Sequence, residues 1–196
     1  MLLVDNIAAM SPPSDHVVDL VRRLRLAPHP EGGWFRELYR DRAVTTIYYV
    51  MEPRGLSPLH RLRTRSELWH FYGGAPVELH LIGDRDGDTA TTHAHRVDER
   101  AATAATADDL HRAGAANDVH VGANEHRVAL LSADAPVAVV PPGAWQAARV
   151  LGDEPALLGC TVAPAFDFAD WQMPTRAELL QRFPLHSALV AALTRP

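Results

Sequence analysis

A histidine and a glutamate seven residues apart, His60 and Glu67, are the most informative pair of side chains in the sequence. An imidazole titrates near neutral pH, and a buried carboxyl group beside it can hold or pass on a proton, so the pair can move a proton to or from carbon. We therefore expect His60 and Glu67 to be catalytic. Glu78 and His80 repeat the two residue types, and we expect them to bind the ligand; the alternative is a solvated or dimer-facing sheet surface.

Alternation with a period of two predicts the strands that position these groups. Residues 59–62 and 67–72 are predicted to form a hairpin with its turn at residues 63–66, and a pair of glycines follows the second strand. Glu67 shares its face of the strand with aromatic side chains, whereas His70 points away from it. Six aromatic residues are expected to divide between the core and the wall of a pocket: Trp34, Phe35, Tyr48, Trp69, Phe71 and Trp145.

The rest of the chain is predicted to consist of strands with short flanking helices. Ser14 is a suitable N-cap for a helix over 14–26, and a capping box of Thr175 and Glu178 opens a C-terminal helical segment over 175–194. Between them, over 27–172, lie roughly eight to ten strand segments. An insertion rich in Ala, Thr, Asp and His, at about 83–124, interrupts them. The 196 residues, 47% of them hydrophobic, fit one domain over 1–196.

Composition excludes several classes of function. The net charge of -5 and the 19 scattered Lys and Arg residues give no basic surface for nucleic acid. No apolar run approaches the length of a membrane span. The single cysteine, Cys160, cannot form an intramolecular disulfide, and residues 1–6 lack the features of a signal peptide, so we expect a cytoplasmic protein. We assign Cys160 no role.

The stretch SPLHRLRTRSELWHFYGG (57–74) resembles the first signature of the cupin superfamily, HxH(x)3-4E(x)6G, and PPGAWQ (141–146) resembles the second, PxG(x)2H. His60, Glu67 and Gly74 match the first signature. The resemblance implies an all-β fold, a jelly-roll cupin barrel in which two sheets enclose inward-facing ligands.

Two of the three histidines that the cupin signatures place around a metal are replaced here, by Leu62 and Gln146. If a metal were present, its ligands would be His60, Glu67 and Gln146. One imidazole, one carboxylate and one amide oxygen are a weak set for a first-row ion, so we expect no cofactor, with a divalent metal as the alternative. A further alternative for Glu67 is an ion pair with Arg36 inside the barrel.

A second HxH pattern occurs inside the insertion. Gly87, His93, His95 and Glu99 fit G(x)5HxH(x)3E, but no glycine follows at the required spacing and the flanks are Ala and Thr rather than packed strands. We interpret these residues as loop histidines, with the rival signature as the alternative.

Five blocks in order are similar to a small, largely uncharacterised branch of cupins: APHPEGGWFRELYR, SPLHRLRTRSELWHFYGG, VELHL, VPPGAWQAARV and LGCTVAPAFDFADW. This resemblance implies a homodimer, with a fold similar to dTDP-sugar epimerases of the RmlC type, germins and cupin phosphoglucose isomerases. His60 matches the pocket histidine of the epimerases. Val162 stands about where they have an acidic residue, so their complete proton relay is not implied.

Three functions remain open. The first is a metal-independent isomerase or epimerase acting by proton transfer on a small, polar, sugar-like metabolite, with His60 as base and Glu67 as acid or orienting group. The second is a binding module without turnover, and the third is a metal-dependent oxygenase, decarboxylase or lyase. In all three the partner is a small molecule, and the expected binding residues are Arg36, Tyr48, Trp69, Phe71, Glu78, His80, Trp145 and Gln146.

Overall fold

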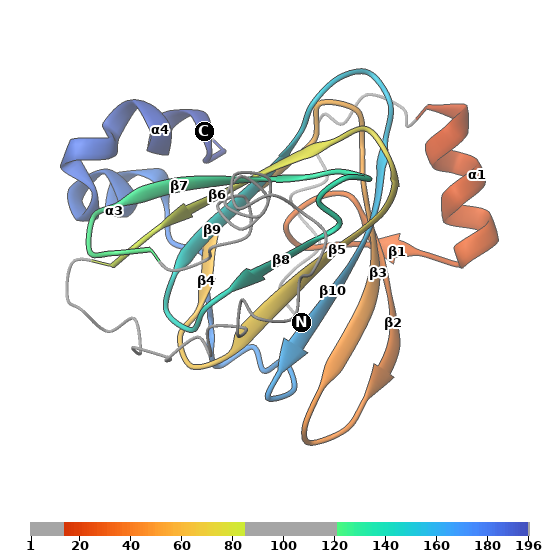
Figure 1. Ribbon diagram of the computed structural model, residues 1–196, viewed down its shortest axis with the longest axis horizontal. Coiled ribbons are helices and arrows are strands. Elements are labelled where there is room, and N and C mark those ends of the chain that lie inside the picture. Colours follow the sequence, from red (N-terminus) through yellow and green to blue (C-terminus); the bar gives the residue numbers. More distant parts are fainter. Residues whose placement is uncertain (1–13, 85–120, 196) are drawn as a thin grey trace, which may run out of the picture.

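The computed structural model describes residues 14–84 and 121–195, which form two antiparallel β-sheets packed face to face (Figure 1). The six-stranded sheet contains, in spatial order, β1 (Ala27–Pro28), β2 (Trp34–Arg40), β3 (Thr45–Met51), β10 (Ala156–Ala163), β5 (Ser66–Gly74) and β8 (Val137–Val140). The five-stranded sheet contains β11 (Trp171–Gln172), β4 (Leu56–Leu62), β9 (Trp145–Val150), β6 (Val77–Ile82) and β7 (His126–Leu131). This is the predicted all-β jelly roll.

Strands β4 and β5 do not form the predicted hairpin, because they belong to opposite sheets. β4 pairs with β9 and β11, whereas β5 pairs with β10 and β8. The turn between them crosses from one sheet to the other and is held by Asp170, whose carboxylate accepts hydrogen bonds from the backbone N–H and the hydroxyl of Thr64. Alternation predicts which face a side chain occupies and not which strand lies beside it, so the hairpin prediction was wrong.

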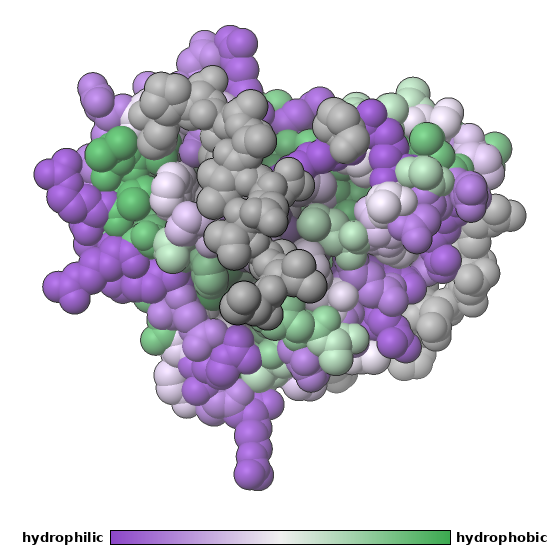
Figure 2. Space-filling view, turned by 180° about the vertical axis from the view of Figure 1, so that it is seen from behind, coloured by the Kyte–Doolittle hydropathy of each residue, from purple (hydrophilic) through white to green (hydrophobic). Residues whose placement is uncertain are grey.

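Apolar side chains from the inner faces of both sheets form the main core. It includes Trp69 and Leu158 from one sheet and Leu79 and Leu131 from the other, all of them almost fully buried. Each side chain of this size stabilises the fold by about 1.5–3 kcal/mol through the apolar area removed from water. Hydrophobic residues on the surface form separate patches among hydrophilic ones on the face that Figure 2 shows.

The N-terminal helix α1 (Asp15–Leu24) confirms the prediction for this segment. Ser14 caps it by accepting a hydrogen bond from Val17 N, and Leu20 packs with Leu26 and Val50 against the six-stranded sheet.

The C-terminal segment covers the outer face of the five-stranded sheet. Its elements are α3 (Arg176–Arg182), η2 (Pro184–His186) and α4 (Ser187–Ala192), and the predicted capping box of Thr175 and Glu178 is present. Phe183 packs against Trp145, with ring centroids 6.0 Å apart. None of the helices in the described ranges is long and apolar enough to cross a membrane.

Candidate functional site

A cavity of about 250 Å³ lies between the two sheets, and His60 and Glu67 both line it. The two residues face each other because β4 and β5 belong to opposite sheets and both side chains point inward. Its wall is formed by residues from β2 to β5, from β10, from the loop after β1 and from the segment before β11: His29, Pro30, Glu31, Phe35, Glu37, Arg40, Thr45, Ile47, Tyr49, His60, Leu62, Glu67, Trp69, Cys160, Val162, Phe166, Phe168 and Trp171.

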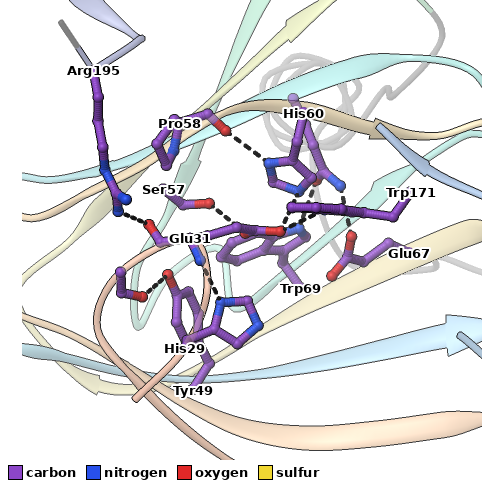
Figure 3. Close-up of polar contacts among 12 residues, drawn as sticks. His29, Glu31, Tyr49, Ser57, Pro58, His60, Glu67, Trp69, Trp171 and Arg195 are labelled. Carbon is purple, nitrogen blue, oxygen red and sulfur yellow. Dashed lines mark hydrogen bonds and ion pairs between the residues drawn. The ribbon is translucent and has the colours of Figure 1, made fainter. Parts of the chain in front are cut away.

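His60 is 2% exposed, and its hydrogen bonds determine which ring nitrogen is free to accept a proton. Nδ1 lies 2.8 Å from the carbonyl oxygen of Pro58. A carbonyl only accepts, so Nδ1 must carry a hydrogen. The other nitrogen, Nε2, lies 3.5 Å from Oε1 of Glu31 (Figure 3). In the neutral ring Nε2 has a lone pair and can take up a proton, and the resulting imidazolium would face a carboxylate.

Glu31 is the residue of this site that the sequence analysis missed. It lies in the loop between β1 and β2, is 7% exposed, and accepts hydrogen bonds from Ser57 Oγ at 2.8 Å and Trp171 Nε1 at 2.9 Å. Burial would raise the pKa of its carboxyl group, but the charges of His60 and His29 and the two hydrogen bonds lower the pKa below its usual value. Glu31 is therefore an ionised group inside the protein.

The loop that carries Glu31 is held by a side chain of β3 and by one near the C-terminus. Gly32 and Gly33 have φ angles of 97° and 70°, which favour glycine. Tyr49 donates its hydroxyl to the carbonyl oxygen of Gly32 at 2.8 Å, and Arg195 Nη2 donates to the carbonyl oxygen of Glu31 at 2.5 Å (Figure 3). These contacts turn the Glu31 side chain into the cavity rather than toward solvent.

Glu67 is held by a chain of two hydrogen bonds. Gln146 Nε2 donates to Glu67 Oε2 at 2.6 Å, and Gln146 Oε1 accepts from Trp69 Nε1 at 2.9 Å. An indole N–H only donates, so the amide oxygen must face Trp69 and the amide nitrogen must face Glu67. Burial raises the pKa of Glu67 above its usual value, and the hydrogen bond from Gln146 and the charge of His60 offset this only in part.

The two buried carboxyl groups of the cavity, those of Glu31 and Glu67, therefore differ in how readily they ionise. The pKa of Glu31 is lowered and that of Glu67 is raised. Such a divergence is the arrangement by which two similar groups serve as acid and base in one site. Cys160, beside Glu67, has a thiol pKa raised well above its usual value by burial and by the nearby carboxylates, so it is a neutral part of the wall.

The donors around the cavity do not fit the divalent metal that the cupin signatures imply. The amide oxygen of Gln146 is directed at Trp69 Nε1, and the atom directed at Glu67 is the amide nitrogen, which donates a hydrogen bond and is not a metal ligand. His60 has only Nε2 left. Within 14–84 and 121–195, His, Cys, Asp and Glu residues form no group of three or more suited to holding a metal ion.

Two residues expected to bind ligand lie on the outer face of the six-stranded sheet. The guanidinium of Arg36 is 5.7 Å from the ring centroid of Tyr48, and neither residue lines the cavity. On β2 it is Phe35 and Glu37 that point inward. The proposed ion pair between Arg36 and Glu67 is therefore wrong. The strand alternates as predicted, but its inner face is the one opposite to Arg36.

Glu78, His80 and Trp145 lie on the outer face of the five-stranded sheet, away from the cavity. Glu78 accepts a hydrogen bond from Arg149 Nη2 at 2.6 Å, and His80 Nδ1 lies 3.1 Å from a ring nitrogen of His126. Trp145 is buried under the C-terminal helices.

The remaining predicted ligand residue, Phe71, packs against the main core and does not line the cavity. Glu78 and His80 thus lie on a sheet face outside the cavity, where His80 is buried, whereas Trp69 lines the cavity and Gln146 contacts the site through its hydrogen bond to Glu67.

The mouth of the cavity was also missed by sequence reasoning. A β-bulge between Glu37 and Tyr39 brings Arg40 to the cavity side of β2. Arg40 Nη1 donates to the carbonyl oxygen of Phe166 at 2.7 Å, and Phe168 beside it is 69% exposed. The conspicuous aromatic content of the segment 166–171 was the only sequence signal. The rival HxH pattern of the insertion lies outside the described residues.

A family model, Cupin_5, described as Cupin superfamily (DUF985), matches residues 18–174. A protein from Shewanella oneidensis is similar in structure, with a TM-score of 0.68 and 25% identity over 95% of this chain and 99% of its own. A hypothetical protein from Leishmania major has the same TM-score, with 26% identity over 91% of this chain and 98% of its own.

A more distant structure shares only the fold. The oxalate decarboxylase of Lactobacillus farciminis has a TM-score of 0.51 and 13% identity, covering 88% of this chain and 43% of its own. No curated protein sequence matches the chain.

Proposed function

The chain belongs to the Cupin_5 family of the cupin superfamily, and we propose that it is a small-molecule-binding cupin that acts as a metal-independent isomerase or epimerase on a small, polar, sugar-like metabolite. The observation that supports this proposal most directly is the position of His60 between two buried carboxyl groups whose pKa values are shifted in opposite directions. The poor fit of the donors to a metal supports chemistry by proton transfer alone.

The geometry assigns a role to each group. Nε2 of His60 takes the proton from a substrate carbon next to a carbonyl group, and the ionised Glu31 stabilises the imidazolium that forms. Glu67, whose raised pKa favours the protonated form, donates its proton to the carbonyl oxygen as the electron pair of the broken C–H bond forms an enediol. Return of the proton from His60 to the neighbouring carbon, while Glu67 takes the proton of the hydroxyl group that becomes the new carbonyl, isomerises the substrate. Delivery of a proton from water to the opposite face of the original carbon, while Glu67 recovers its proton from the enediol oxygen and His60 releases its own to solvent, epimerises it.

Solvent exchange tests the proposal without knowledge of the physiological substrate. In D2O, wild-type protein should introduce deuterium at a carbon next to the carbonyl of at least one monosaccharide of a panel of aldoses, ketoses and amino sugars, followed by NMR. His60→Ala should lower the rate by about 100-fold or more, since a positioned acid or base contributes roughly 10²–10⁴-fold.

His70→Ala is the matched control. His70 lies on the outward face of β5, stacked near Tyr72, and does not line the cavity, so its removal should leave exchange unchanged. Absence of exchange with the wild type across the panel, or full exchange in His60→Ala, would contradict the proposal. A co-purified small molecule that survives incubation without chemical change would favour the alternative of a binding module.

A further inference from the structure

Carboxyl groups outnumber cationic side chains among the described residues that line the cavity. Three carboxyl groups line it, those of Glu31, Glu37 and Glu67, and the only guanidinium among the lining residues is that of Arg40. Arg40 lies at the mouth and is already paired, with Nη2 2.8 Å from Glu37 and Nη1 donating to the carbonyl oxygen of Phe166. Of the described lining residues, those in the interior therefore include two carboxyl groups, Glu31 with a lowered pKa and Glu67 with a raised one, and no guanidinium or ammonium group.

Among the remaining ionisable groups of the wall, His60 is the one whose positive charge would offset that of Glu31, because its Nε2 lies 3.5 Å from Glu31 Oε1; in the neutral form that the proposed function requires, His60 adds no charge. Burial lowers the pKa of His29, and its Nδ1 accepts a hydrogen bond from Glu31 N. Burial raises the pKa values of Tyr49 and Cys160 well above their usual ranges, so both are neutral. Arg195 approaches the same loop but donates to the backbone carbonyl of Glu31 and does not line the cavity.

Glu31 can accept further hydrogen bonds from a ligand. Each of its carboxylate oxygens accepts one hydrogen bond from the protein, from Trp171 at Oε1 and from Ser57 at Oε2. A carboxylate oxygen has two acceptor positions, so each retains one. The Glu67 carboxyl group is more occupied, because its Oε2 accepts from Gln146 and the Cys160 thiol also hydrogen-bonds to it.

Aromatic rings supply much of the remaining wall: Phe35, Tyr49, Trp69, Phe166, Phe168 and Trp171. The face of an aromatic ring attracts a cation, and the attraction grows when the cation is desolvated. An anion in the same place would meet the carboxylate of Glu31. The volume of about 250 Å³ limits the ligand to about the size of one monosaccharide.

We propose that the ligand of this cavity carries a protonated amine, as an amino sugar does, and that Glu31 is the carboxylate that selects it over neutral and acidic analogues. This inference deepens the proposed function, on which it rests for the sugar-like character of the ligand. It concerns binding, so it can be measured without turnover.

Three compounds that share a ring and differ in charge test the selection. Isothermal titration calorimetry at neutral pH should give D-glucosamine an affinity at least about tenfold above that of D-glucose, which corresponds to about 1.4 kcal/mol. D-glucuronate should show no detectable binding. N-acetyl-D-glucosamine, in which the amine has lost its charge, should not bind more tightly than glucose.

Glu31→Gln identifies the residue responsible, because it removes the charge and keeps an acceptor oxygen. The variant should lose the preference for glucosamine over glucose. Glu78→Gln is the matched control, since Glu78 is on the outer sheet face, and it should keep the preference. The comparison of sugars uses the wild type, so it stands even if Glu31→Gln does not fold.

Glucuronate binding as tightly as glucosamine, equal affinity for glucosamine and glucose, or no binding of glucosamine would each overturn the inference. Failure of the proposed function looks different. Selective binding of the amine without deuterium exchange would contradict the isomerase and leave the inference intact. Exchange on a neutral or acidic sugar, without any preference for the amine, would support the isomerase and contradict the inference that the ligand is an amine.

Discussion

The inner and outer faces of the barrel each contain a histidine beside a glutamate, and the two pairs have different surroundings. Inside, His60 and Glu31 are almost fully buried, border a cavity and have no guanidinium bound to the carboxylate. Outside, His80 lies 3.4 Å from Glu78, whose carboxylate is occupied by Arg149. A histidine and a glutamate can therefore act together on a ligand only where they border a cavity and the carboxylate is not already bound to a guanidinium group.

The largest expected difference between the two pairs is in catalysis. Glu31→Gln should lower the deuterium-exchange rate by about tenfold or more, because the imidazolium of His60 loses the carboxylate that stabilises it. Glu78→Gln should leave the rate unchanged. Measuring both variants on the same exchanging sugar checks the comparison, and equal losses in the two variants would remove the distinction between the faces.

A smaller difference is expected between two tryptophans. Trp69→Phe removes the N–H that binds Gln146 and leaves a buried amide oxygen unpaired, which should lower the free energy of unfolding by about 1–3 kcal/mol. Trp34→Phe breaks the bond from an indole to Glu52 at a partly buried position, where water can replace the lost donor. Urea unfolding should show the smaller loss for Trp34→Phe, and a larger loss there would contradict the importance of the inner hydrogen-bond chain.

The smallest expected effects concern the pH dependence of stability. The pKa of Glu67 is raised in the folded protein, so the native state holds the proton more tightly than the unfolded state and this residue costs stability as the pH rises through its titration. Glu67→Gln should thus gain stability over wild type on going from acid to neutral pH.

Glu78 should behave in the opposite way. Its pKa is lowered, mainly by the hydrogen bond from Arg149, so its contribution is present above its unfolded pKa and is lost as the pH falls. Glu78→Gln should be destabilised relative to wild type at neutral pH and should approach it in acid. Urea unfolding of both variants across this range checks the two signs, and parallel curves would refute the assigned pKa directions.

Local sequence patterns predicted much of the scaffold. The helix after Ser14, the capping box of Thr175 and Glu178, and the outward direction of His70 all follow from neighbours a few residues apart. Alternation also predicted that His60 shares a face with Leu62 and Glu67 with Trp69, and the resemblance to cupin signatures predicted that these faces point into one barrel. These features depend on short-range capping and on the two-residue repeat of a strand, which the sequence displays directly.

The composition of the site depended on contacts between distant segments. Glu31 meets Trp171 across 140 residues and Gln146 meets Glu67 across 79, and no local pattern links either pair. Whether Phe35 or Arg36 faced the cavity, and whether β4 and β5 paired or crossed between sheets, was likewise decided by the packing of the whole barrel.

The sequence by itself thus determined the strands, the caps and the side chains that share a strand face with His60 or Glu67, because each depends on covalent neighbours. Only the tertiary structure decided which carboxylate faces His60, which groups restrain Glu67 and which aromatic rings enclose the ligand space. Those properties arise from burial and charge contributed by several segments at once, and the pKa values of Glu31 and Glu67 diverge only when those segments are packed together.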